Sequence, residues 1–187
     1  MFRSVAFPRN ISFLLIARLI KEKGIPDYVK AARIVKDKYP QSKFRLVGWI
    51  DEGPNVISKL DLDSWVKDRT IEYLGKLDDV RTAIANTSVY VLPSYHEGTP
   101  RTVLEAMSMG RPIITTDAPG CRETVNHGEN GFLVPVRDPI ALAEAMERFI
   151  KEPELIPKMG KRSREIAEEK YDVNKLNAVI LKNIGLL

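Results

Sequence analysis

The sequence contains few of the residues on which several classes of protein depend. Its 187 residues include one cysteine, two histidines and two tryptophans. The single cysteine, Cys121, excludes an intramolecular disulfide framework and a cysteine-based zinc finger. The histidines, His96 and His127, do not have the spacing of metal ligands. The tryptophans, Trp49 and Trp65, do not form the aromatic series that stacks on single-stranded nucleic acid.

Long apolar runs and runs of like charge are also missing. The longest apolar stretches, such as residues 11–17, are far shorter than the roughly 20 residues needed to span a bilayer. Residues 1–10 contain Arg3, Pro8 and Arg9 and lack the apolar core of a secretory signal. The 29 basic and 25 acidic residues are interspersed, giving a net charge of +4. This balance favours anionic partners such as phosphates and gives no specific support to nucleic-acid binding.

The composition is that of one globular domain with a substantial core. Hydrophobic residues make up 44% of the chain and charged residues 29%. A length of 187 residues fits a single large domain that needs no disulfide or metal to fold. The lone cysteine fits a reducing compartment.

Apolar runs alternate with amphipathic stretches along most of the chain. The apolar runs predict strands over residues 12–17, 44–47, 70–74, 88–92, 112–116 and 131–134. The amphipathic stretches predict helices over residues 25–38, 60–67, 79–85, 100–109, 139–151, 153–170 and 172–184. Asp78 and Thr99 are expected to cap the third and fourth helices, and Pro157 to interrupt or bend the sixth. This alternation predicts the α/β fold class, with a three-layer doubly wound parallel sheet of about six strands.

Two glutamates follow the fourth predicted strand. Ligands of such sheets bind where the strands end, so the candidate loops are 18–24, 48–57, 75–78, 93–99 and 117–121. Glu97 lies in one of these loops, and Glu105 lies in the helix that starts near Pro100. One carboxylate can accept hydrogen bonds from a sugar, and the other can take a vicinal diol such as ribose. From these residues alone, a solvated loop glutamate and a surface helix glutamate remain an alternative.

Two cations follow the first predicted strand. Arg18 offers a planar fork to a diphosphate, and Lys23 offers a point charge on a flexible stem. Gly24 then precedes the first helix, whose N-terminus favours an anion. The alternative is a charged surface loop that holds no ligand.

Four segments taken together resemble a known family. They are Arg18…Lys23-Gly24, Tyr73-Leu74-Gly75, Pro93-Ser94…Glu97-Gly98…Pro100…Glu105…Gly110…Pro112, and Gly128-Glu129-Asn130-Gly131. From about residue 10 to residue 184 the chain is similar to the C-terminal, donor-binding domain of family 4 (group 1) retaining glycosyltransferases. That domain is the Rossmann-like half of the GT-B fold. Residues 100–125 are most similar to bacterial enzymes that add sugars to lipid-linked surface glycans.

The resemblance implies a role for each matching residue. Arg18 and Lys23 bind the donor diphosphate and stabilise the departing nucleoside diphosphate, and Glu97 contacts hydroxyls of the donor sugar. These three are the implied catalytic residues, while Glu105 binds the ribose. The strand end at 73–77 holds the base, largely by backbone contacts. The other implied donor-binding residues are Gly24, Gly48, Tyr73, Leu74, Gly75, Leu77, Ser94, Gly98, Thr99, Pro100, Arg101 and Leu104.

The resemblance also implies the reaction and its partners. The donor is a nucleoside-diphosphate sugar, with UDP-hexose or UDP-N-acetylhexosamine as the first expectation. The acceptor is a glycan or a polyprenyl-linked glycan. In this family the departing phosphate takes the acceptor proton during front-face attack, so no covalent carboxylate is expected. The resemblance also implies that no metal or cofactor is needed. The expected location is cytoplasmic, with room for peripheral association at the inner face of the membrane.

Two departures from the family pattern stand out. Trp49 and Ile50 follow Gly48, where the family often has a second glycine. Such enzymes are also longer, with an N-terminal acceptor domain ahead of the part matched here. We therefore expect a linker remnant over 1–10, the donor-binding domain over 11–170 and a crossover helix over 171–187, with the acceptor domain absent.

Other functions are less well supported by the residues. A non-catalytic nucleotide-sugar-binding module remains open, and a nucleotide-sugar epimerase fits the fold but not the residues Arg18, Lys23, Glu97 and Glu105. The glycine fingerprints of dinucleotide-binding oxidoreductases and P-loop NTPases are missing. Asp61 and Asp63 resemble a metal-binding Asp-x-Asp pair, but they lie in a predicted helix, where a solvated face is favoured.

Overall fold

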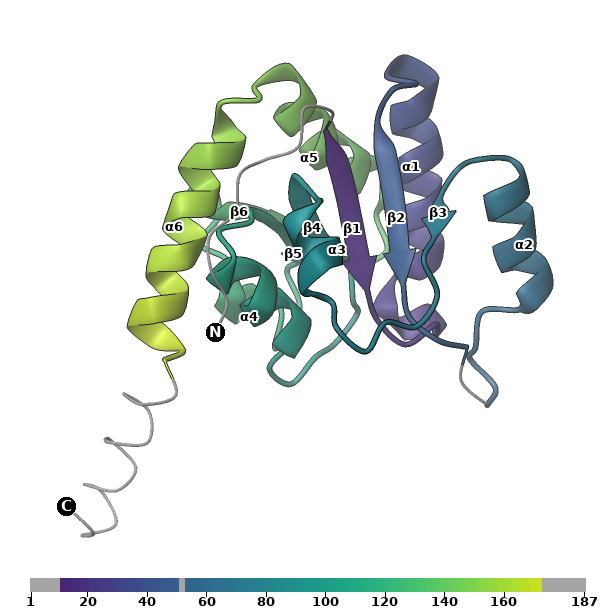
Figure 1. The fold of residues 1–187 in the computed structure, drawn as a ribbon, viewed down its shortest axis with the longest axis horizontal. Helices are drawn as coiled ribbons and strands as arrows, with labels where there is room; N and C mark the ends of the chain where they lie inside the picture. Colours follow the sequence, from purple (N-terminus) through teal and green to yellow (C-terminus); the bar gives the residue numbers. More distant parts are fainter. Residues whose placement is uncertain (1–10, 51–52, 173–187) are drawn as a thin grey trace, which may run out of the picture.

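The computed structural model describes residues 11–50 and 53–172, which form a three-layer α/β unit (Figure 1). Its sheet has six strands in the order β3-β2-β1-β4-β5-β6, and every neighbouring pair is parallel. The strands are β1 (Ser12–Ile16), β2 (Lys43–Val47), β3 (Glu72–Tyr73), β4 (Val89–Leu92), β5 (Ile113–Thr116) and β6 (Gly131–Val134). The predicted fold class is confirmed.

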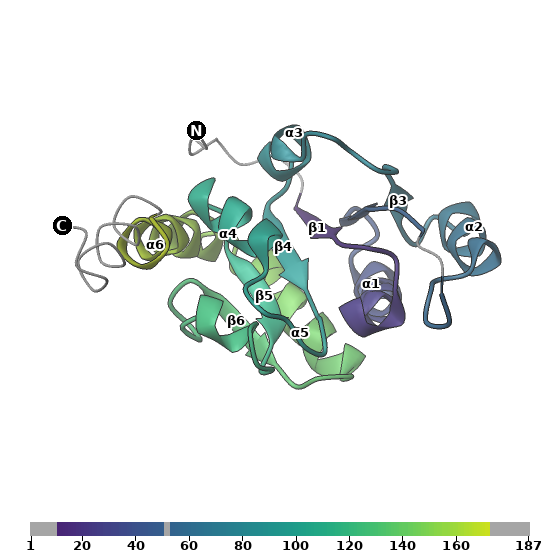
Figure 2. The ribbon, with the colours of Figure 1, turned by 90° about the horizontal axis from the view of Figure 1, so that it is seen from below.

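Helices cover both faces of this sheet (Figure 2). The α-helices are α1 (Ile25–Lys38), α2 (Lys59–Lys67), α3 (Arg81–Ala85), α4 (Arg101–Ser108), α5 (Pro139–Lys151) and α6 (Leu155–Lys170). Two short 3-10 helices, η1 (Lys21–Lys23) and η2 (Arg122–Thr124), follow β1 and β5. The described chain crosses from one half of the sheet to the other between β3 and β4, as a doubly wound sheet does.

The core is divided by the sheet into two apolar layers. Phe13 and Leu15 of β1 pack in the layer that includes residues of α1, α2 and α5. Leu14 and Ile16 pack in the layer that includes residues of α3, α4 and α6. Successive side chains of a strand point to opposite faces, so a strand buried on both faces must be apolar throughout. This requirement explains why β1 reads as an uninterrupted apolar run.

The predicted strand over 70–74 is longer than the observed strand β3. The backbone amides of Thr70 and Ile71 both donate to the carbonyl of Trp65 in α2, at 3.0 and 3.3 Å. These two residues therefore complete the end of the helix, and pairing with β2 begins only at Glu72. A pattern of apolar residues does not determine whether a backbone amide donates to a helix carbonyl or to a neighbouring strand.

Three expectations about helix ends were wrong. Asp79, rather than Asp78, accepts the Arg81 amide at the start of α3, at 2.9 Å. Thr99 does not cap α4, which begins at Arg101 after Pro100 without a side-chain cap. Pro157 does not interrupt α6, because it lies in the first turn, where its missing amide costs no hydrogen bond within the helix. The predicted helix over 172–184 lies almost wholly outside the described residues.

Candidate functional site

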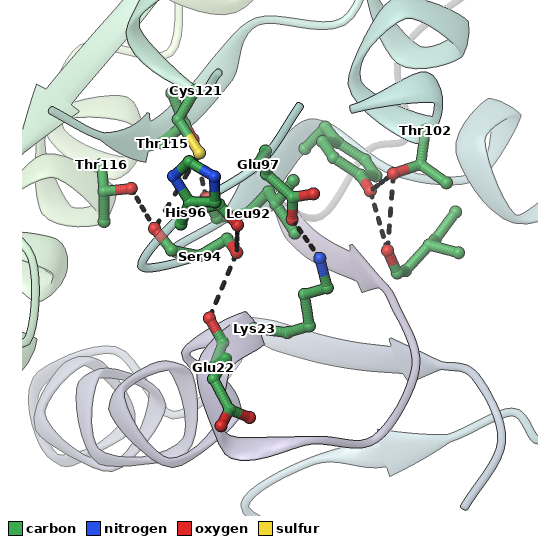
Figure 3. A network of polar contacts seen from close by, with 12 residues as sticks. Glu22, Lys23, Leu92, Ser94, His96, Glu97, Thr102, Thr115, Thr116 and Cys121 are labelled. Carbon is green, nitrogen blue, oxygen red and sulfur yellow. Dashed lines mark hydrogen bonds and ion pairs between the residues drawn. The ribbon is translucent and has the colours of Figure 1, made fainter. Parts of the chain in front are cut away.

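The loops that follow β1 and β4 meet at the carboxyl edge of the sheet. The ammonium of Lys23, in η1, lies 2.6 Å from a carboxylate oxygen of Glu97, and both side chains are largely buried, at 18% and 13% exposure. These residues are separated by 74 positions in the sequence. Figure 3 shows the ion pair bridging the two loops. The structure thus joins two of the three residues expected to be catalytic.

Backbone contacts fix the loop that carries Glu97. The carbonyl of Glu22 accepts from the Ser94 hydroxyl at 3.2 Å and from the Tyr95 amide at 2.9 Å. The Glu97 amide donates to the carbonyl of Pro119 at 3.1 Å, which ties the same loop to the one after β5. The loop that carries Glu97 is therefore held between the loops that follow β1 and β5.

Gly24 allows the two loops to approach so closely. Its φ of 69° lies in the left-handed region, and a Cβ there would lie 1.9 Å from the carbonyl oxygen of Pro93. A second close approach occurs at Gly120, where a Cβ would lie 2.0 Å from the carbonyl oxygen of Glu97. Gly98 is different, because a Cβ there meets nothing within 4 Å.

Buried donors beneath the site hold Ser94 and the end of β4. Thr115 donates to the Leu92 carbonyl at 2.7 Å, and the Thr116 hydroxyl donates to the Ser94 carbonyl. The Cys121 thiol also points to the Ser94 carbonyl, at 3.9 Å (Figure 3). Burial raises the pKa of this thiol, so Cys121 serves as a buried donor and not as a thiolate nucleophile.

Glu105 lies in the second turn of α4 and is half-buried. Burial raises the pKa of its carboxyl, Arg101 lowers it and Asp79 raises it further. A carboxylate that is costly to ionise and sits near a ligand-binding edge is a candidate functional group. Arg101 itself is exposed, as are Arg18 and Thr99.

The pKa of Glu105 predicts how its replacement changes stability with pH. In the folded chain the pKa of the Glu105 carboxyl is raised above its ordinary value of 4.5. The wild type therefore loses stability as the pH rises from the ordinary pKa through the raised one. Glutamine cannot ionise. We therefore expect the free energy of unfolding of Glu105→Gln to rise relative to the wild type between about pH 4 and pH 7. Urea denaturation across that range measures it, and a difference that stays constant with pH would contradict the assignment.

The loops after β2 and β3 form a third part of the edge. The Tyr73 hydroxyl donates to the carbonyl of Gly48 at 2.9 Å, and the Gly48 amide donates to the carbonyl of Gly75 at 2.9 Å. The Leu74 side chain is 40% exposed. The side chains of Leu77 and Leu104 instead pack against the core layer of α4, so these two expected donor-binding residues also have a structural role.

Several residues that support the site were not singled out from the sequence. The hydroxyl of the buried Tyr90 lies 2.7 Å from the Thr102 hydroxyl and 3.2 Å from the Ile16 carbonyl oxygen, and these contacts tie the first turn of α4 to the end of β1. The Tyr95 hydroxyl contacts Asp27 at 2.8 Å, and burial raises the pKa of Tyr95 to about 12. The sequence could have indicated a supporting role for Tyr90, because a tyrosine in an otherwise aliphatic strand needs a hydrogen-bond partner for its hydroxyl.

A hollow of about 600 Å³ lies between β6 and α5, and its lining includes no residue of the loops that carry Lys23 and Glu97. Its charged lining includes Glu147, which already contacts Lys38 at 2.7 Å and Lys151 at 2.8 Å. These interactions lower the pKa of Glu147 and occupy both of its oxygens. The hollow is therefore a poorer candidate than the edge where Lys23 and Glu97 meet.

The described residues contain no cluster suited to a metal ion. No group of three or more His, Cys, Asp or Glu side chains is placed to bind one within residues 11–50 and 53–172. Asp61 belongs to the first turn of α2, where its amide donates to the Ser58 hydroxyl at 3.0 Å. Over the same described residues, none of the helices combines the length and the apolar character of a membrane span.

Comparison with known proteins now identifies the family. Residues 10–152 match the family model described as glycosyl transferases group 1. The chain belongs to the group 1 glycosyltransferases. The resemblance expected from Arg18, Lys23, Glu97 and Glu105 is therefore confirmed at the level of the family.

Bacterial glycosyltransferases are among the relatives of this domain. The Campylobacter jejuni N,N'-diacetylbacillosaminyl-diphospho-undecaprenol alpha-1,3-N-acetylgalactosaminyltransferase is 32% identical over 178 residues, which cover 91% of this chain and 45% of that enzyme. The Staphylococcus aureus capsular polysaccharide biosynthesis glycosyltransferase CapM is 29% identical over 164 residues, covering 87% and 43%. The chain thus spans about half the length of the curated relatives that it matches.

Solved glycosyltransferase structures share the fold. Anabaena Alr3699/HepE in complex with UDP-glucose superposes with a TM-score of 0.80 and 24% identity, over 96% of this chain and 50% of that one. This likeness establishes the fold, which is the Rossmann-like half of the GT-B fold.

Proposed function

We propose that this chain is the donor-binding half of a retaining glycosyltransferase that takes a UDP-sugar. The observation that carries the proposal is the Lys23–Glu97 pair, 2.6 Å apart and largely buried, at the carboxyl edge of the sheet. A phosphate-binding cation beside a sugar-binding carboxylate is what a sugar diphosphate requires. The UDP-glucose complex of the Anabaena neighbour supports a UDP-sugar, such as a UDP-hexose or a UDP-N-acetylhexosamine.

Two helix N-termini support the diphosphate site. Helix α1 begins after Gly24 and helix α4 begins after Pro100, and neither start has a side-chain cap. Free backbone amides and the positive end of the helix dipole favour an anion at such a start. Arg18 and Lys23 add two cations to the same edge, so the donor phosphates are neutralised without a metal ion.

The proposed residues stabilise charge that develops as the sugar leaves. Lys23 and Arg18 stabilise the departing nucleoside diphosphate, and Glu97 accepts hydrogen bonds from sugar hydroxyls. Donor phosphate competes with Glu97 for the Lys23 ammonium, which frees the Glu97 carboxylate to face the sugar. The acceptor oxygen bonds to the anomeric carbon from the same face that the nucleoside diphosphate leaves, and the departing phosphate takes the acceptor proton. The anomeric configuration is therefore retained without a covalent enzyme intermediate.

The acceptor side of the reaction belongs to a second domain in this proposal. Residues 11–170 form the donor-binding domain, and an N-terminal acceptor domain completes the cleft. The undecaprenol-linked substrate in the name of the Campylobacter relative supports a glycan or polyprenyl-linked glycan as the acceptor. It also supports peripheral association of the complete enzyme with the cytoplasmic face of a membrane.

A transfer assay tests whether this chain binds the donor and a second domain binds the acceptor. We expect no sugar transfer when the purified 187-residue chain is incubated with UDP-sugars and polyprenyl-linked acceptors. We expect transfer with a retained anomeric configuration, followed by NMR, when the chain is joined to an acceptor domain of the same family. Transfer by the chain alone would show that it is more than a donor half. Donor binding without transfer by the joined protein would favour a non-catalytic nucleotide-sugar-binding module.

A further inference from the structure

Trp49 is an exposed aromatic residue next to the proposed diphosphate site. It follows Gly48 at the carboxyl end of β2, and 43% of its surface is exposed. Its carbonyl accepts from the Leu19 amide at 2.9 Å, so its backbone lies directly beside the loop that carries Arg18. The exposed part of its indole ring offers a flat apolar surface at this edge.

The loop after β3 connects Trp49 to the proposed ribose site. The Lys76 ammonium lies over the Trp49 ring, 5.8 Å from its centroid. Leu77 packs in the same core layer as Leu104 of α4. Two residues further along, Asp79 is close enough to raise the pKa of Glu105. This short loop therefore runs from the Trp49 ring to the carboxylate that is proposed to bind ribose.

These contacts place Trp49 and Lys76 on the side of the edge toward which the base of a bound donor would extend. Its diphosphate would lie at Arg18 and Lys23, its ribose at Glu105, and the remaining boundary is formed by Trp49 and Lys76. A base has two apolar faces that stack on an aromatic ring, and a nearby cation strengthens the interaction. The size and flatness of the indole ring match those of a nucleobase.

We propose that Trp49 is the stacking surface for the nucleobase of the donor, an inference that rests on the proposed function. The family resemblance assigns the base to backbone contacts at 73–77. The family often has a second glycine after Gly48, where this chain has Trp49. In this chain the indole ring supplies a side-chain contact as well. Trp49 thereby sets the affinity for the nucleoside part of the donor and contributes little to binding of the diphosphate.

Binding measurements on substituted chains separate stacking from a structural role. By calorimetry, we expect Trp49→Ala to weaken UDP binding about 10-fold, which corresponds to about 1.4 kcal/mol, and to leave inorganic pyrophosphate binding unchanged. Trp49→Phe keeps an aromatic face and should stay within about 3-fold of the wild type. Ile50→Ala is the matched control, because Ile50 is the next residue and is 42% exposed. It should bind UDP as the wild type does.

Fluorescence gives a second, direct readout. The sequence has two tryptophans, so Trp65→Phe leaves Trp49 as the reporter. We expect saturating UDP to quench its emission and pyrophosphate to leave it unchanged, because only the base stacks on the ring. Unquenched emission at saturating UDP would overturn the proposal.

The outcomes distinguish this inference from the function on which it rests. If the wild type binds UDP and Trp49→Ala binds it equally well, the stacking role is wrong while the donor-binding function stands. If Trp49→Ala weakens UDP and pyrophosphate to the same extent, the effect is structural and the stacking role is again wrong. If the wild type binds no nucleoside diphosphate, the proposed function itself fails and this inference fails with it.

Discussion

Replacing Lys23 with alanine is expected to weaken UDP binding by about 10- to 150-fold. A hydrogen bond to a charged group contributes about 1.5–3 kcal/mol, and the Lys23 side chain is only 18% exposed, so solvent screens it little. The substitution also leaves the Glu97 carboxylate near the phosphates without the cation that it contacts at 2.6 Å. Binding of uridine, which lacks the diphosphate, should change much less.

Lys21→Ala is the matched control for this substitution. Lys21 belongs to the same 3-10 helix, η1, and its side chain is exposed. Isothermal titration calorimetry with UDP and with uridine measures both variants, and chemical denaturation confirms that they are folded. Equal UDP affinities for the wild type and Lys23→Ala would remove Lys23 from the proposed diphosphate site.

Gly24→Ala is expected to destabilise the fold and to abolish detectable UDP binding. The left-handed backbone at this position costs a non-glycine residue about 1–2 kcal/mol. The new Cβ would lie 1.9 Å from the Pro93 carbonyl oxygen, and relieving such overlap costs about 1–3 kcal/mol more. We therefore expect a loss of about 2–5 kcal/mol in the free energy of unfolding. Moving Gly24 from Pro93 also separates Lys23 from Glu97.

Gly98→Ala tests whether the effect depends on the close approach. Gly98 lies in the loop of Glu97, yet a Cβ there meets nothing within 4 Å. Its free energy of unfolding should stay within about 0.5 kcal/mol of the wild type, as for most surface substitutions. If Gly24→Ala were as stable as Gly98→Ala, the loop contact described here would not exist in solution.

Much of the fold could be predicted because local and tertiary preferences agree along the chain. The helix α5 begins at Pro139 and ends at Lys151, as the sequence indicates. Its start is fixed by Asp138, whose side chain accepts from the amides of Ile140 and Ala141. The exceptions are places where two partners compete for one backbone group. Thr70 and Ile71 have strand-like sequence but complete helix α2, and this choice depends on packing that the sequence pattern does not contain.

The sequence supplies candidate residues for the site but not their arrangement. Arg18, Lys23, Glu97 and Glu105 were identified from their motifs and from the rule that ligands bind at the carboxyl ends of parallel strands. The ion pair of Lys23 with Glu97 could not be predicted, because it depends on the approach of Gly24 to Pro93 across the sheet. The network beneath it depends in the same way on contacts between distant segments.

Titration of the 187-residue chain with UDP in the presence of EDTA tests the central claim most directly. We expect binding with a Kd of about 10–1000 μM, because an open site on one domain encloses little of a small ligand. EDTA should not abolish it, because the proposed site neutralises the diphosphate with Arg18 and Lys23. Failure of UDP and of every other nucleoside diphosphate to bind at millimolar concentration would contradict the assignment of this domain to the donor.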